Sequence, residues 1–144
     1  MKIFLDANIC LDLLDTTRPS SKNSIKWYLS NKDNENFEFY FSGDFITTFY
    51  YILTEKRKYD AKKTLQAIDM LCNEIAPHYI THIDFKNAKV YFFNDIFEDF
   101  EDLLILHSAI RIKCNYFITN DKKLLKLSNF YNINIVSPEN RGGL

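Results

Sequence analysis

Glycine and proline are scarce in this sequence, with only three of each in 144 residues. Because these residue types supply most turns and linkers, their scarcity argues against long loops and low-complexity segments. Cysteine is equally scarce, and Cys10, Cys72 and Cys114 lie far apart, without a Cys-x-x-Cys pair or a Cys/His ligand spacing. We therefore expect reduced, buried thiols and neither a disulfide framework nor a zinc site.

An excess of charge is also missing, since 18 Lys and Arg face 19 Asp and Glu and the net charge is −1. Any site for a polyanion must therefore be a local cluster of basic residues. Long apolar runs are missing as well, because Asp6, Asp12 and Asp15 interrupt the first fifteen residues. This pattern excludes a signal-peptide core or a membrane span, and we expect a cytoplasmic protein with no membrane partner.

The composition is otherwise that of a globular protein, with 47% hydrophobic and 26% charged residues and many aromatics, 13 Phe and 9 Tyr. A chain of this length can bury a core without metal or disulfide staples. We expect a single domain over residues 1–140, followed by a loose C-terminal tail at 141–144.

Short apolar runs alternate with segments of helical periodicity along the chain. The runs predict five strands, at 2–5, 37–41, 79–83, 116–119 and 133–136. Helical spacing and end signals predict helices at 20–30, 44–58, 61–74, 84–96 and 101–113. This order predicts an α/β fold, a three-layer α/β/α sandwich around a central, mostly parallel five-stranded sheet.

Carboxylates stand at the ends of two predicted strands, where Asp6 follows Lys2–Leu5 and Asp121 follows the run that begins at Tyr116. If the two strands are neighbours in a parallel sheet, both carboxylates lie at its ligand-binding edge. Asp99 and Asp102 are three residues apart near the start of the preceding helix and share a face. We therefore expect the four aspartates to converge on one pocket.

Four carboxylates in one pocket repel one another unless a cation neutralises them. Oxygen ligands without His or Cys favour Mg²⁺ or Mn²⁺, and carboxylate-held ions of this kind activate water against phosphodiesters. The plainer interpretation is that Asp6, Asp99 and Asp121 merely cap helices, which is common for aspartate. The combination of two strand ends with a pair three residues apart favours the metal site.

These residues are where the chain resembles a known family, the PIN domain nucleases, and in particular their VapC-type toxin branch. The opening KIFLDANICLDLL resembles the first strand of that family and its Asp-x-Asn motif. DFEDLLILHSAIRIKCNYFITND resembles its aspartate-headed helix and the strand that ends in Thr-x-Asp, and VSPE resembles its usual close. The site residues that the resemblance implies are the catalytic and metal-binding Asp6, Asp102 and Asp121, the additional acid Asp99, and the supporting Asn8 and Thr119.

The resemblance implies a metal-dependent ribonuclease that acts on RNA and is restrained, as a toxin, by a cognate antitoxin. One position departs from the family pattern, because Thr48 stands where the helix after the second strand usually carries an acid, and there it is expected only as a supporting polar residue. Asp99 is the first candidate to compensate, and Glu101 ranks below it since it points about 100° away from Asp102 on a helix. The alternative function is a catalytically degenerate PIN-like module that binds RNA or protein.

Other side chains allow two interpretations each. Basic clusters at 56–63 and 122–126 could bind RNA phosphates or could be solvated helix ends. The aromatic residues at 45–51 and 91–93 have the helical spacing of a core or an interface, although they could instead stack on bases. An exposed patch at 49–51 would suit a homodimer or an antitoxin helix. The three histidines lack metal-ligand spacing and are expected on the surface or in strands.

Overall fold

The central sheet consists of short strands, and the first of them, Lys2–Leu5, has three consecutive buried residues. The computed structural model describes residues 1–140, so the tail expected at 141–144 lies outside the described residues. Six strands pair in the order β3-β2-β1-β4-β6-β5, and all neighbours are parallel except β5 and β6. The strands are β1 (Lys2–Leu5), β2 (Glu38–Ser42), β3 (Ala76–His78), β4 (Tyr116–Ile118), β5 (Asn129–Phe130) and β6 (Ile133–Val136).

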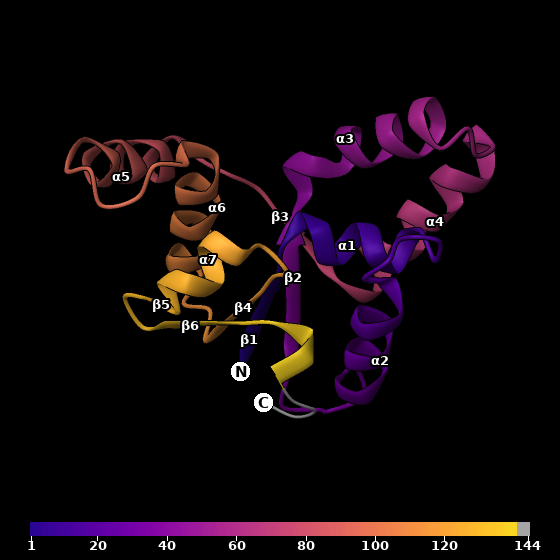
Figure 1. Ribbon diagram of the computed structural model, residues 1–144, viewed down its shortest axis with the longest axis horizontal. Helices are drawn as coiled ribbons and strands as arrows, with labels where there is room; N and C mark the ends of the chain where they lie inside the picture. Colours follow the sequence, from indigo (N-terminus) through magenta and orange to yellow (C-terminus); the bar gives the residue numbers. More distant parts are fainter. Residues whose placement is uncertain (141–144) are drawn as a thin grey trace.

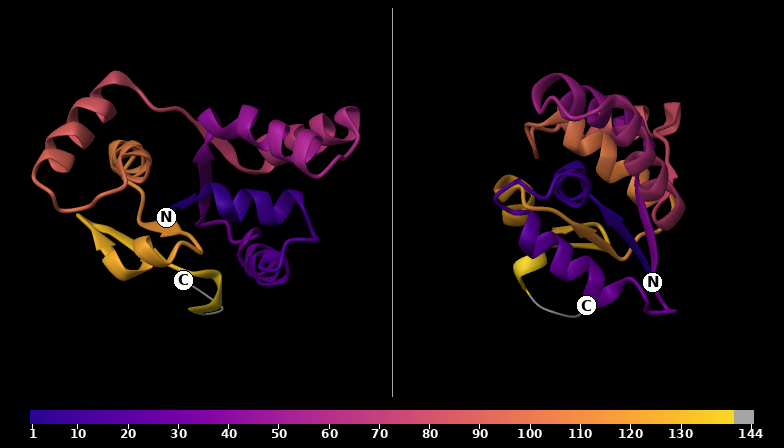
Figure 2. Two further views of the ribbon diagram at one scale, coloured as in Figure 1. Left: turned by 45° about the horizontal axis from the view of Figure 1, so that its top comes forward. Right: turned by 90° about the vertical axis from the view of Figure 1, so that its right-hand side faces the viewer.

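Helices cover both faces of the sheet, which confirms the predicted three-layer α/β/α sandwich (Figure 1). One layer contains α1 (Ala7–Leu14), α2 (Ser21–Asn31), α3 (Ile46–Tyr51) and α4 (Ala61–Glu74). The other layer contains α5 (His82–Phe93), α6 (Phe100–Arg111) and α7 (Lys122–Leu127). Figure 2 shows the two layers from further directions, with α5 lying outside α6 and the β5–β6 pair below them.

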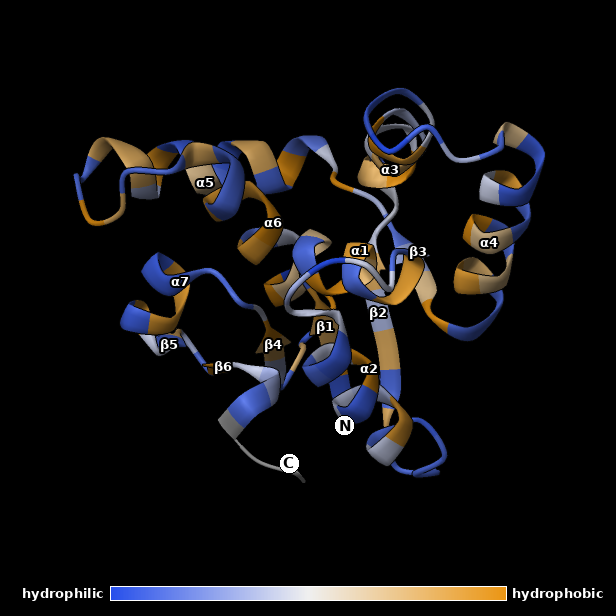
Figure 3. Ribbon diagram, turned by 45° about the vertical axis from the view of Figure 1, so that its right-hand side comes forward, coloured by the Kyte–Doolittle hydropathy of each residue, from blue (hydrophilic) through white to orange (hydrophobic). Residues whose placement is uncertain are grey.

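Alternating side chains of the strands feed two hydrophobic cores. Ile3 and Leu5 pack with the layer of α1 to α4. Phe4 points the other way and stacks on Phe117 of β4, with ring centroids 5.5 Å apart, in the core beneath α5, α6 and α7. Apolar residues therefore run along the strands and on the helix surfaces that face them (Figure 3). This double burial explains why the strand sequences are apolar without alternation.

Two of the strand predictions need correction. The sheet has six strands rather than five, because the two-residue edge strand β5 is too short for any periodicity to reveal it. The predicted strand at 79–83 is wrong, since β3 ends at His78. The side chains of Thr81 and Asp84 form a capping box that starts α5 at His82, so this segment enters a helix instead.

The single helix predicted over 44–58 is also wrong. The segment consists of a 3₁₀ turn at Gly43–Phe45, the short helix α3 and a π-helical turn at Ile52–Lys56. In that turn the amide of Arg57 donates to the carbonyl of Ile52, five residues back. The other four predicted helices agree with α2, α4, α5 and α6 to within three residues at each end. Among residues 1–140, no helix has the length and apolarity needed to cross a bilayer.

The strand order reverses at β1, which pairs with β2 on one side and with β4 on the other. The adjacency on which the predicted pocket depends is therefore present, and the carboxyl ends of β1 and β4 lie side by side. Ligands of open α/β sheets bind at such a reversal, outside the carboxyl ends of the strands. The fold thus marks one place for a functional site.

Candidate active site

Asp6 lies where β1 passes into α1, at the reversal point of the sheet. Its backbone amide donates to the carbonyl of Ile118, which extends the pairing of β1 with β4 by one residue. Its carboxylate caps α1 by accepting a hydrogen bond from the amide of Ala7 at 2.8 Å. The side chain is 9% exposed. Asp6 therefore serves as a helix cap and also presents a carboxylate at the edge of the sheet.

Thr119 connects the ends of the two strands. Its buried hydroxyl donates to Oδ2 of Asp6 at 2.7 Å and accepts the backbone amide of Asp121 at 3.0 Å. The amide of Asn8 donates 3.2 Å hydrogen bonds to both Asp6 and Thr119, while its Oδ1 accepts the backbone amide of Asn120 at 3.1 Å. The two polar residues implied by the resemblance thus hold Asp6 and Asp121 in a fixed relation.

Asp99 and Asp102 approach the same edge from the start of α6. Asp99 is the N-cap of this helix and accepts the backbone amide of Asp102 at 3.1 Å. Asp121 has the same role in α7, where its Oδ1 accepts the amide of Lys123 at 2.8 Å and that of Leu124 at 3.4 Å. All three caps leave carboxylate capacity unused, since an ionised carboxylate has about four acceptor positions. Capping and ion binding are therefore compatible.

Oδ2 of Asp102 is the only buried side-chain nitrogen or oxygen in residues 1–140 that lacks a hydrogen-bond partner. The surroundings raise the pKa of Asp102 to about 7. Burial is the first cause, followed by nearby negative charges, those of Asp6, Asp99, Asp121 and Glu101. The pKa of Asp6 is raised as well, because burial outweighs its hydrogen bonds from Thr119 and Ala7. A buried acceptor without a donor, set among like charges, is the environment that a cation would stabilise.

The acids form an open cluster rather than a closed cage. In the part of the chain that the structure describes, no three acidic, histidine or cysteine side chains are close enough to ligate one ion together. Mg²⁺ sites often have this form, since the ion keeps several water ligands and takes only one or two carboxylates directly. The donor set of carboxylate oxygens therefore fits a hard divalent ion.

Two residues weighed in the sequence lie differently from this cluster. Thr48, at the position where an acid was expected, is exposed on α3. No hydrogen bond within residues 1–140 links its side chain to the four aspartates. Glu101 is exposed in the first turn of α6, yet it still contributes to the raised pKa of Asp102, after Asp99 in order of size.

The family model of the PIN domain matches residues 2–123, which include all four aspartates. The chain belongs to the PIN domain family. The expected resemblance is thereby confirmed. One relative of this PIN domain is Ribonuclease VapC1 from Aquifex aeolicus, which is 34% identical over 126 residues. The match covers 84% of this chain and 82% of that protein, and the PIN domain therefore stands with the VapC-type branch.

Solved structures of VapC proteins share the fold of this PIN domain. VapC20 of Mycobacterium tuberculosis, described as a sarcin-ricin loop cleaving toxin, has a TM-score of 0.67 and 11% identity, covering 92% of this chain and 98% of that one. VapBC2 of Rickettsia felis, bound to a DNA fragment from its promoter, has a TM-score of 0.65 and 16% identity over 95% and 98%. VapBC-1 of nontypeable Haemophilus influenzae has a TM-score of 0.66 and 17% identity over 96% and 98%.

Reasoning from the sequence missed a buried network beside the site of the PIN domain. The carboxylate of Asp12 is fully buried and accepts hydrogen bonds from Arg18 at 2.8 Å, from Ser20 and Ser24, and from the side chain of Asn120 at 3.2 Å. A signal was available, because Asn8 and Asp12 are four residues apart and share one face of a helix.

Proposed function

We propose that this PIN domain is an endoribonuclease that depends on Mg²⁺ or Mn²⁺, acts on RNA in the cytoplasm, and belongs to a toxin-antitoxin pair. The observation that carries the proposal is the buried Oδ2 of Asp102, which has no hydrogen-bond partner. Burial and then the negative charges of three further aspartates raise the pKa of this carboxyl group, and a bound cation would relieve that repulsion. The likeness to Ribonuclease VapC1 supports RNA as the substrate. The likeness in fold to VapBC structures supports an antitoxin as the partner.

Asp6, Asp102 and Asp121 would hold the metal, directly or through its water ligands, and Asp99 would compensate for the acid that is missing at Thr48. A divalent ion held there would supply Lewis-acid chemistry, which lowers the pKa of a water nucleophile and offsets the charge on the leaving oxygen of a phosphodiester. Thr119 orients Asp6 through its 2.7 Å hydrogen bond, and Asn8 holds the strand ends together. Asp99 fixes the first turn of α6 and so keeps Asp102 at the edge of the sheet.

An RNA cleavage assay tests the proposal directly. The purified chain is incubated with end-labelled RNA in Mg²⁺, in Mn²⁺ and in EDTA, beside Asp6→Asn and the control Asp69→Asn, which changes an exposed residue of α4. Removing a metal-binding carboxylate should reduce the cleavage rate by at least about 100-fold, the scale of one electrostatic contact in a reaction. Equal cleavage by Asp6→Asn, or full cleavage in EDTA, would contradict the assignment.

The alternative function is a degenerate module that binds RNA or a protein without cleaving, and the exposed Thr48 favours it. Titration with Mn²⁺ by calorimetry distinguishes the two. A chain that binds Mn²⁺ and RNA through its aspartates yet leaves RNA intact is the degenerate module. Restoring the acid with Thr48→Glu should then raise cleavage, whereas an active wild-type chain should gain little from that change.

We also propose a homodimer, because α3 leaves aromatic surface exposed. Tyr51 is 53% exposed and Tyr50 36%, whereas their neighbour Phe49 on the same helix is fully buried. Light scattering coupled to gel filtration measures the mass in solution. A monomer at all concentrations would exclude the dimer, and a dimer that Tyr51→Lys dissociates would place the interface on α3.

A further inference from the structure

A second hollow, separate from the acidic cluster, is bordered by α5, α6 and the turn that follows β5. It has a volume of about 320 Å³, and two aliphatic side chains form part of its wall. Its polar and aromatic lining consists of Asn87, Tyr91, Asn94, His107 and Tyr131. None of these residues takes part in the site described above.

His107 presents a hydrogen-bond acceptor to this hollow. It was expected on the surface or in a strand, but it lies in α6 and is only 7% exposed. Its Nδ1 is 2.8 Å from the carbonyl oxygen of Leu103, which can only accept, so Nδ1 carries the hydrogen. In the neutral ring Nε2 is then an acceptor, and it has no hydrogen-bond partner among residues 1–140. This nitrogen does not belong to the fully buried unpartnered atoms, so it is open to the hollow, where an N–H of a ligand can reach it.

Aromatic rings form the walls of the hollow. Tyr91 packs against His107 and against Phe130, with centroids 6.0 and 5.0 Å apart. Tyr131 stands at the rim, 63% exposed, with its ring edge-to-face on Phe130. Its φ of 53° lies in the left-handed region that a bulky residue rarely adopts. The backbone thus accepts strain at the residue that offers an open ring face for stacking.

We infer that this hollow binds a nucleobase of the RNA, which stacks on Tyr131 and donates an N–H to Nε2 of His107. The side-chain amides of Asn87 and Asn94 can donate and accept, so they suit the polar edges of a base. Every base has a π face and an N–H donor, which makes the site tolerant of sequence. The inference rests on the proposed function for its substrate class and assigns that substrate a second contact.

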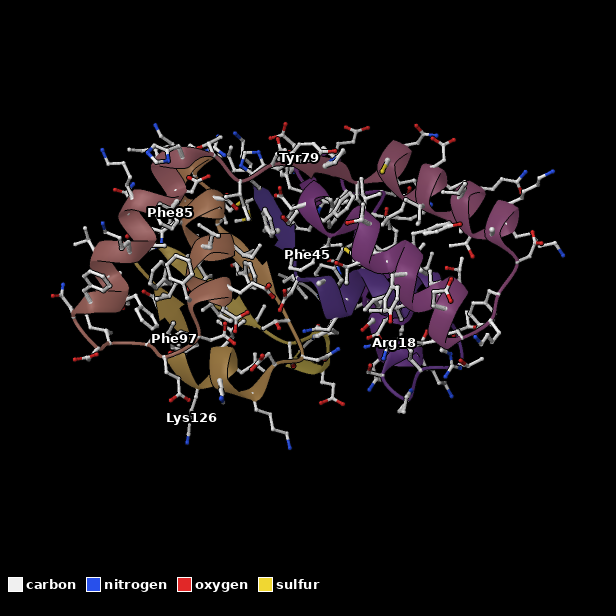
Figure 4. The ribbon with its side chains drawn as sticks, turned by 90° about the horizontal axis from the view of Figure 1, so that it is seen from above. Arg18, Phe45, Tyr79, Phe85, Phe97 and Lys126 are labelled. Carbon is white, nitrogen blue, oxygen red and sulfur yellow. The ribbon has the colours of Figure 1, made fainter. Side chains whose placement is uncertain are left out.

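Basic side chains lie on α7, and one of them, Lys123, forms an exposed ion pair with Glu98 at 3.1 Å. The loop that follows Asn94 and helix α7 border a neighbouring hollow, whose lining includes Lys123 and Lys126. Both lysines are exposed, and Lys126 projects outward from α7 (Figure 4). Lys123 follows Asp121 by two residues, so phosphates on these lysines would connect a scissile bond at the aspartates to a base in the hollow.

Nucleotide binding can be measured without any cleavage. The ¹⁵N-labelled full chain in EDTA is titrated with cytidine 5′-monophosphate and, separately, with ribose 5-phosphate. The nucleotide should shift the amide signals of residues 87–94, 107 and 131, and the sugar phosphate should leave them unchanged. His107→Phe keeps the ring contacts but removes the acceptor, and Tyr131→Asn removes the ring at a backbone conformation that Asn tolerates. Each should weaken binding about tenfold, the scale of one stacked base.

Phe93→Ala is the matched control, because Phe93 is a 70% exposed aromatic of α5 that does not line the hollow. Its affinity should equal that of the wild type. Shifts confined to the lysines or the aspartates, or equal shifts with both probes, would overturn the inference. If His107→Phe fails to fold, the affinity of Tyr131→Asn and the set of amide signals that shift in the wild type still test the inference. Cleavage of RNA does not enter this measurement, so either proposal can fail while the other stands.

Discussion

Replacing Asp102 with Asn should stabilise the metal-free protein while it removes a proposed metal ligand. The surroundings raise the pKa of Asp102 to about 7 from an ordinary value of 3.8, chiefly through burial and then through the charge of Asp6. A raised carboxyl pKa means that the ionised form is disfavoured in the folded state. The contribution of neutral Asp102 to the free energy of unfolding is therefore fully present below pH 3.8 and is lost as the pH rises through about 7. Asparagine stays neutral and escapes this loss.

The size of the effect follows from the pKa difference. A shift of about three units corresponds to about 4 kcal/mol when the group is fully ionised, at roughly 1.4 kcal/mol per unit. Asp102 is only partly buried, and solvent screening reduces this figure to about 2 kcal/mol. For a chain of this length that change raises Tm by about 6 °C at pH 8. At pH 5 the gain should fall to about a third, because less of the titration has occurred.

Urea unfolding followed by circular dichroism, in EDTA at pH 5 and pH 8, measures both values. The exposed Asp69→Asn is the control and should change stability by less than about 0.5 kcal/mol at either pH. Adding Mn²⁺ should then stabilise the wild type, by about 2.7 kcal/mol at a hundred times its Kd, and should stabilise Asp102→Asn much less. If Asp102→Asn is no more stable than the wild type at pH 8, the carboxylate is not under the repulsion described here.

Three further outcomes test other parts of the structure. Arg111→Met should lower the free energy of unfolding by about 3 kcal/mol at pH 7, because it leaves the carboxylate of Asp84, which is 1% exposed, without its ion-pair partner. Burial would raise the pKa of Asp84, but its hydrogen bonds from Arg111 help hold that pKa below the usual value. The difference in free energy of unfolding between the wild type and Arg111→Met should therefore shrink as the pH falls through about 4 and Asp84 becomes protonated. Gly43→Ala should lower the free energy of unfolding by about 1 kcal/mol, because the new Cβ would lie 2.5 Å from the ring of Tyr79. Adding Tyr79→Ala removes that ring and should restore most of the lost stability. In the native protein at pH 8 only Cys72 should react with a thiol reagent, as measured by absorbance, since the other two cysteines are buried.

The parts of the site that the sequence revealed are those where local pattern and topology coincide. A strand of this kind can be recognised as an apolar run that stops on an aspartate, because a parallel strand is buried on both faces whereas its carboxyl end is not. Asp6 and Asp121 stand at such ends, and the pairing of β1 with β4 brings them together. The capping roles of Asp6, Asp99 and Asp121 leave carboxylate oxygens available for the proposed metal site.

The parts that the sequence concealed depend on partners remote in the chain. The capping box of Thr81 with Asp84 is local and competes with the β-propensity of its neighbours, but the guanidinium that also holds Asp84 belongs to Arg111, 27 residues away. Asp12 appears in the sequence only as an interruption of an apolar stretch. Its importance comes from Asn120, 108 residues away, which donates to it across the fold. Such contacts arise from tertiary structure, beyond the reach of periodicity.

The hydrogen bond between Thr119 and Asp6 spans 113 residues and joins the first strand to a late one. A chain emerging from the ribosome displays Asp6 early, but it lacks Thr119 and Asp121 until β4 has been made. The acidic cluster therefore cannot assemble on a nascent or prematurely terminated chain. A fragment that ends before β4 therefore carries Asp6, Asp99 and Asp102 but lacks Thr119 and Asp121, and on the proposed function it should not cleave RNA.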